Sequence, residues 1–91
     1  MLRISRKTDY GLLFLSSLAR NYPEQLVPLS EIAAQNKLPL PYLRQIAQVL
    51  HKAGIIYSKE GVHGGYQLAK APSTITMTEV ITIFEGALAN W

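Results

Sequence analysis

Residues 41–53 carry the pattern that most restricts what this chain can fold into. Apolar side chains recur there at steps of three and four residues, which is the spacing of one face of an α-helix. They are Leu43, Ile46, Ala47 and Leu50. Pro41 suits the first helical position, and Gly54 suits the position just past the last turn. The pattern predicts an amphipathic helix that buries one face and leaves the other polar.

Weaker patterns before residue 41 predict two more helices. Thr8 is expected to cap a first helix that closes at residues 21–23, with its apolar positions at Tyr10, Leu13, Phe14 and Leu18. Residues 26–29 contain Pro28 and therefore fit only a brief edge strand. Ser30 is expected to cap a short helix over residues 31–35, which a turn over residues 36–40 joins to the helix at 41–53.

A hairpin and a fourth helix are predicted after residue 54. Residues 55–59 and 66–69 are β-prone, and the glycines between them permit the backbone angles of a hairpin loop. Thr76 and Glu79 form a capping box. The helix that follows is expected to bury one stripe and to stop at Gly86. The stripe consists of Met77, Val80, Ile81 and Phe84.

This order of elements predicts a mainly α fold with a small β-hairpin, the winged helix-turn-helix. With 91 residues the chain is long enough for one core, so residues 1–91 are expected to form a single domain. In such domains the second helix of the pair lies in the major groove of DNA, and the hairpin, or wing, reaches the backbone or the minor groove.

Composition narrows the possible functions. There is no cysteine, which excludes disulfides, thiolate catalysis and cysteine-ligated metal. The net charge of +3 favours an anionic partner only mildly. Residues 12–18 are too short an apolar run to span a membrane, and the N-terminus has no secretory pattern. These features fit a cytoplasmic protein without a membrane partner.

The polar face of residues 41–53 is the candidate for reading bases. It offers Tyr42, Arg44, Gln45 and Gln48. Arginine can bind guanine O6 and N7 through two hydrogen bonds, and glutamine can pair with adenine in the same way. A polar face can also serve only solubility, but the turn before this helix and the hairpin after it favour DNA.

Basic residues elsewhere are candidates for backbone contacts, which set the register on DNA without specifying sequence. They are Lys59 in the wing and Arg3, Arg6 and Lys7 near the N-terminus. His63 in the hairpin loop is either a phosphate contact or a solvated loop residue. His51 is expected to be a helix-surface residue, because no second metal ligand stands at coordinating spacing.

Four segments together resemble the Rrf2 family of bacterial transcriptional regulators. They are residues 3–10 (RISRKTDY), 42–46 (YLRQI), 53–56 (AGII) and 61–70 (GVHGGYQLAK). The resemblance runs from Met1 to about Gly86. It implies a dimeric, DNA-binding regulator, usually a repressor, with Tyr42, Arg44 and Gln45 in the groove and Gly64 and Gly65 at the wing tip.

The chain departs from that family at three places. Family members commonly have Glu at the position of Arg44 and Arg at the position of Glu60, so a different operator and a weaker wing contact are expected. Relatives also continue into a cysteine-bearing loop and a long dimerisation helix, whereas this sequence stops at Trp91. Asp9 matches a position that helps to hold a cluster in some relatives. Without thiolates, no cofactor is expected, and an isolated portion and a naturally short member both remain open.

The sequence thus predicts a non-enzymatic regulator that binds a double-stranded operator as a homodimer, at least on DNA. Its helix 41–53 is expected to read the major groove, and its wing at 59–66 to contact the backbone or the minor groove. The alternative is a winged-helix module for protein–protein interaction, docking through Ala87, Leu88 and Trp91. An enzyme is a third alternative and is disfavoured, because no nucleophile, base and orienting group can be assembled from the motifs.

Overall fold

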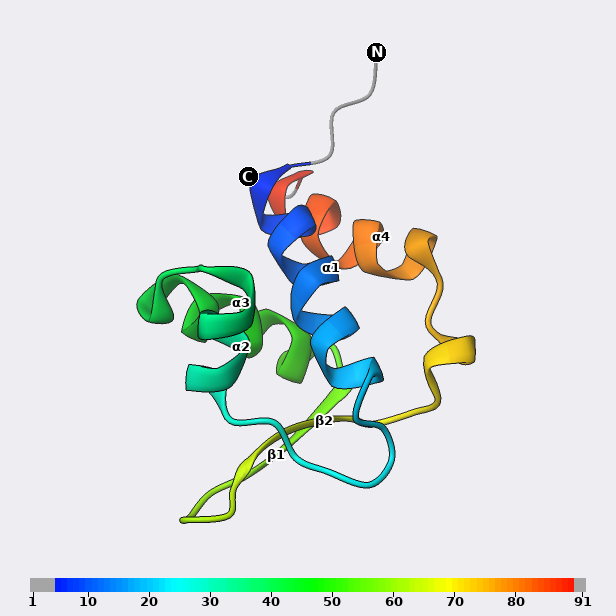
Figure 1. Ribbon diagram of the computed structural model, residues 1–91. Coiled ribbons are helices and arrows are strands. Elements are labelled where there is room, and N and C mark those ends of the chain that lie inside the picture. Colours follow the sequence, from blue (N-terminus) through cyan, green and yellow to red (C-terminus); the bar gives the residue numbers. More distant parts are fainter. Residues whose placement is uncertain (1–4, 90–91) are drawn as a thin grey trace.

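The computed structural model in Figure 1 describes the backbone of residues 5–89 and the side chains of residues 5–86. In chain order the elements are helices α1 (Arg6–Ala19), α2 (Leu29–Asn36) and α3 (Leu40–Lys52), strands β1 (Ile56–Lys59) and β2 (Gly65–Leu68), a 3₁₀ turn η1 (Pro72–Thr74) and helix α4 (Met77–Ala89). Helix α1 lies at the centre and contacts α2, α3, α4 and β2. The expected mainly α winged helix-turn-helix fold is confirmed.

The core forms where the apolar faces of the helices meet. The predicted stripe of α3 is buried throughout, since Leu43, Ile46, Ala47 and Leu50 are each at most 2% exposed. Phe14 and Leu18 of α1 and Ile32 of α2 pack into the same cluster. Leu13 was expected on the buried stripe of α1 but is 41% exposed, because the neighbouring elements cover α1 on its other sides.

The hairpin pairs β1 with β2 in antiparallel register, from Ile56 opposite Leu68 to Lys59 opposite Gly65. In place of the edge strand expected over residues 26–29, the structure has a single bridged residue pair. There Val27 and Tyr66 exchange two backbone hydrogen bonds, of 2.7 and 2.8 Å. Pro28 has no N–H to continue the ladder, which explains why the pairing stops at one residue.

The starts of the first three helices differ from the sequence-based expectation. Helix α1 begins at Arg6, because the Ser5 hydroxyl, not that of Thr8, accepts the first-turn N–H. Helix α2 begins at Leu29 rather than after Ser30, since the Pro28 carbonyl accepts from the N–H groups of residues 31 and 32. Helix α3 begins at Leu40, one residue before Pro41, and Gly54 follows it with φ of 82°.

One of the two hydrogen bonds of the predicted capping box forms at the start of α4. The Thr76 hydroxyl accepts from the Glu79 N–H at 3.0 Å, but the Glu79 carboxylate binds Lys70 at 2.8 Å instead of turning back. Met77 is 54% exposed, so it does not belong to the buried stripe. The helix also continues through Gly86 to Ala89, because Gly86 does not adopt the positive φ with which a glycine ends a helix.

The end of α4 lies against the start of α1. Thr8, which is fully buried, donates its hydroxyl hydrogen to Glu85 at 2.6 Å. Hydrogen bonds from Ser5 and Thr8 lower the pKa of Glu85 below its ordinary value. Gly11 makes the close approach possible, since a Cβ at this position would overlap the ring of Phe84. Two helices from opposite ends of the described chain are therefore fastened together.

Candidate nucleic-acid interface

Helix α3 presents a polar face on the side away from the core. Arg44, Gln45 and Gln48 are exposed, and they alternate with the buried stripe as an amphipathic helix requires. Among residues 5–86, the salt bridge present joins Lys70 to Glu79, so Arg44 is not held by a carboxylate. Its guanidinium is therefore available to an external partner.

Tyr42 makes a packing contact that the sequence did not reveal. Its ring packs edge-on against the ring of Tyr10, with centroids 5.0 Å apart and the planes at 83°. The residue is half-buried. Tyr42 thus helps to set α3 on α1, and only part of its ring faces outward.

The wing is the hairpin loop with its adjoining strand ends, residues 59–66, which projects away from the helices (Figure 1). Lys59 and His63 are exposed in it, and Val62 is 96% exposed. Val62 was not among the predicted site residues. Its apolar side chain at a loop tip is a signal that sequence reasoning could have used.

Gly64 and Gly65 are required for the shape of the wing. A Cβ on Gly64 would overlap the carbonyl oxygen of Lys59. Gly65 has φ of 151°, and a Cβ there would lie 2.6 Å from the carbonyl carbon of Val27. Both glycines therefore position the loop, and neither has a side chain to offer a ligand.

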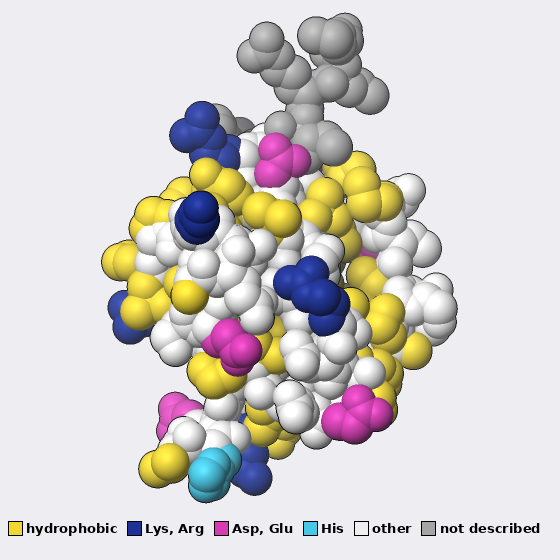
Figure 2. Space-filling view, in the orientation of Figure 1, with side chains coloured by type: hydrophobic (Ala, Val, Ile, Leu, Met, Phe, Trp, Pro, Cys, Tyr) yellow, Lys and Arg dark blue, Asp and Glu magenta, His cyan; other side chains and the backbone are white. Residues whose placement is uncertain are grey.

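The basic residues predicted to contact the DNA backbone do not all lie close together in the structure. Arg6 and Lys7 are exposed at the start of α1, at the end of the molecule opposite the hairpin (Figure 1). Arg3 lies outside the described residues. In Figure 2 the Lys and Arg side chains are spread over the visible face instead of forming one patch. The basic residues of α1 and of the wing would therefore contact separate stretches of a bound duplex.

A cleft that the sequence did not predict lies between α3 and the hairpin. It is lined by Ala47, Gln48, His51, Lys52, Ser58 and Tyr66, and we call it the α3–hairpin cleft. The sequence analysis placed His51 on the helix surface and assigned no role to Lys52. It had no means of placing Ser58 opposite them, because that depends on how the hairpin folds back on α3.

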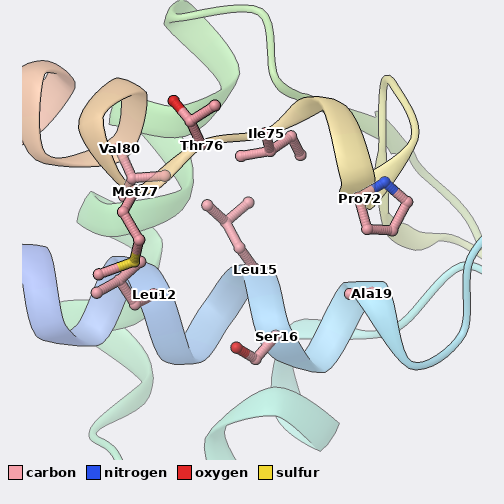
Figure 3. Close-up of a pocket in the computed structure, with 9 residues that line it drawn as sticks. All are labelled: Leu12, Leu15, Ser16, Ala19, Pro72, Ile75, Thr76, Met77 and Val80. Atoms are coloured by element: carbon pink, nitrogen blue, oxygen red, sulfur yellow. The ribbon is translucent and has the colours of Figure 1, made fainter.

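A second hollow, shown in Figure 3, is mainly apolar and lies between α1 and residues 72–80. Leu12, Leu15 and Ala19 line it from α1, and Ile75, Met77 and Val80 line it from the other side. Its polar side chains are the hydroxyls of Ser16 and Thr76. Without a base or an acid beside them, these hydroxyls do not make a catalytic site.

A helix-turn-helix formed by α2 and α3, with a β-hairpin beside it, defines the chain as a winged helix-turn-helix protein. Residues 4–90 match the Rrf2 family, which is described as "Iron-dependent Transcriptional regulator". The chain belongs to the Rrf2 family of transcriptional regulators, which is not a family of enzymes.

Individual relatives agree in sequence and in structure. The transcriptional regulator CymR of Bacillus subtilis is 36% identical over 97% of this chain and 64% of its own length. IscR of Escherichia coli is 35% identical over 96% of this chain and 54% of its own length. The solved structure of B. subtilis CymR matches with a TM-score of 0.91 and 40% identity, covering 94% of this chain and 67% of that one. The chain thus spans between half and two thirds of these regulators.

The side chains present do not fit the iron in the family description. The sequence has no cysteine. Within the described part of the chain, His, Asp and Glu nowhere gather in the threes that could hold a metal ion. No helix over the described residues is long and apolar enough to cross a membrane.

Proposed function

We propose that this chain is a sequence-specific, double-stranded-DNA-binding domain of a cytoplasmic transcriptional repressor. The observation that carries the proposal is the exposed face of α3, with Arg44, Gln45 and Gln48, beside a wing that projects from the same fold. An α-helix fits the major groove, and these residue types match the hydrogen-bonding edges of guanine and adenine.

In this proposal α3 reads bases, and the rest of the surface fixes the register. Arg44 binds a guanine, and Gln45 and Gln48 bind adenines or backbone. Lys59 contacts a phosphate next to the wing, and His63 and Val62 lie where the wing meets the minor groove. Arg6 and Lys7 contact the backbone at the other end of the domain, and Arg3 is assigned to the same group from the sequence alone.

The chain binds its operator as a homodimer in this proposal. Helix-turn-helix proteins bind half-sites about 34–36 Å apart, one helical turn of DNA. The molecule extends 42 × 28 × 21 Å. Its two shorter dimensions, 28 and 21 Å, are both smaller than this spacing. The side chains of Ala87, Leu88 and Trp91, which the sequence suggested as a contact surface, lie outside the described residues.

Selection of bound sequences from random duplex DNA tests the function and identifies the operator together. We expect a short, inverted-repeat consensus whose affinity falls steeply with salt concentration. Enrichment of no sequence, with no salt-dependent binding to any duplex, would contradict the proposal and favour a protein-interaction module.

A further inference from the structure

We propose that the α3–hairpin cleft binds one phosphate of the DNA backbone. The inference rests on the proposed function, and it assigns a ligand to His51, Lys52 and Ser58, to which the sequence analysis and the family comparison assigned none.

The chemistry of the cleft fits an anion. Gln48, His51, Lys52, Ser58 and Tyr66 line it, all residue types that carry side-chain hydrogen-bond donors, and no Asp or Glu is among the lining residues. The volume of about 280 Å³ exceeds that of several water molecules, at about 30 Å³ each, so a phosphate group fits. These hydrogen-bond donors would replace the hydration of a phosphate oxygen.

The walls of the cleft are held in place by packing. Ala47 is 2% exposed and forms the base of the α3 side. On the hairpin side, Tyr66 is paired with Ser58 across the strands and bridged to Val27, and its ring packs edge-on against Phe14 at 5.6 Å. The site is therefore formed before DNA arrives, and binding does not have to order the backbone of either wall.

The charges around the cleft favour the same ligand. Lys52 is exposed at the end of α3 and is not part of the salt bridge found among the described side chains. An adjoining hollow is lined by one acidic residue, Glu60, together with Lys59. Lys52 thus lines the cleft from the end of α3, whereas Glu60 lines the adjoining hollow at the wing loop.

The position of the cleft favours a phosphate of the DNA backbone as its ligand. The cleft lies between the helix proposed for the major groove and the wing proposed for the adjacent minor groove. The ridge between the two grooves of a duplex is the sugar–phosphate backbone. In the proposed complex, a duplex that contacts both α3 and the wing brings its backbone to this cleft.

The test compares the full chain with Lys52→Ala and Ser58→Glu in binding to the selected operator and to an unrelated duplex. Lys52→Ala should weaken binding to both duplexes about fivefold and reduce the slope of log affinity against log salt by about 0.9, as loss of one phosphate contact does. Ser58→Glu, which places a carboxylate in the cleft, should weaken both further. Base preference should not change in either variant.

Two matched variants complete the experiment. Lys70→Ala removes the same charge beside α4, where Glu79 already pairs with it, and should keep the wild-type salt slope. Arg44→Ala reports on the proposed function itself. If Arg44→Ala weakens operator binding while Lys52→Ala and Ser58→Glu keep wild-type affinity and slope, the cleft assignment is overturned and the DNA-binding proposal stands.

Other results also decide the question. A wild-type chain that binds no duplex overturns both proposals. If Lys52→Ala alters only the stabilisation of the protein by inorganic phosphate and leaves DNA binding intact, the cleft takes a free anion and the assignment to DNA is wrong. Thermal melting of each variant confirms that it is folded, which is expected because Lys52 and Ser58 are exposed.

Discussion

In the proposed interface, Arg44 is the residue that we expect to contribute most to base specificity. Its planar guanidinium has paired donors that match guanine O6 and N7, a geometry that lysine cannot reproduce. The residue stands on the exposed face of α3, between buried Leu43 and exposed Gln45. A change at this position should therefore alter which base is preferred as well as how tightly DNA is bound.

We predict that Arg44→Ala lowers operator affinity by about 1–3 kcal/mol and relaxes the preference at one base pair. Arg44→Lys is the matched control, because it keeps the charge and loses the paired donors. It should retain the wild-type salt slope while still losing that preference. Binding to a set of operators with single base changes measures both effects, and an unchanged preference in both variants would remove Arg44 from the readout.

Gly65 is the residue where backbone geometry tolerates substitution least. We predict that Gly65→Val lowers the free energy of unfolding by at least about 1–3 kcal/mol, because φ of 151° disfavours a β-branched side chain and the new Cβ would press on the Val27 carbonyl. Gly86→Ala is the control, since its Cβ meets nothing within 4 Å and its helical position favours alanine. Denaturant titration would contradict the argument if the two variants were equally stable.

Among the elements, α1 and α4 form a pair whose ends are held by side-chain hydrogen bonds. The Ser5 hydroxyl caps α1, the Thr8 hydroxyl contacts Glu85 of α4, and the two hydroxyls are 3.0 Å apart. The pair encloses Phe84 at its core side. This contact joins residues 77 positions apart, so it helps to decide where α4 lies.

We predict that the hydrogen bond between Thr8 and Glu85 makes the free energy of unfolding depend on pH in the acidic range. The pKa of Glu85 is lower in the folded protein than its ordinary value of 4.5, so its contribution is fully present above that value and is lost as pH falls through the folded pKa. The denaturation midpoint of Glu85→Gln should therefore fall below that of the wild type at pH 7, and the gap should close as the pH falls through the folded pKa of Glu85. Glu24→Gln, at an exposed loop position, is the control.

At the scale of the whole molecule, one copy of the chain has one helix proposed for the major groove, α3, and one wing. A single set of such contacts binds weakly, and joining two on a palindromic site multiplies the affinity. The exposed Leu13 and Met77 add apolar surface on the α1 and α4 side of the molecule, away from the wing.

We predict that the free chain is largely monomeric in the low micromolar range and dimerises on an operator with two half-sites. Sedimentation across a wide concentration range measures the first property, and cooperativity on the two-site duplex measures the second. Inserting about 5 base pairs between the half-sites turns them to opposite sides of the helix and should abolish cooperativity. Non-cooperative binding to the unmodified site by a strict monomer would contradict the dimer proposal.

Local pattern alone predicted the order of elements, the buried stripe of α3 and the glycine-dependent hairpin. These features depend on residues within a few positions of one another, so periodicity and turn chemistry reveal them. The polar face of α3 followed directly, because whatever is opposite a buried stripe faces outward. For the same reason Arg44, Gln45 and Gln48 could be placed on the surface without a structure.

The tertiary structure decided what depends on distant residues. Thr8 was expected to cap a helix, but it is buried and hydrogen-bonded to Glu85. The ring of Tyr42 packs on Tyr10 and is only partly exposed. Met77 was expected in the core but lies outside it. The α3–hairpin cleft exists only because the hairpin folds back on the last turn of α3, held by the Val27–Tyr66 bridge. Sequence spacing carries no information on such pairings, because packing between elements, rather than the chain between them, brings these side chains together.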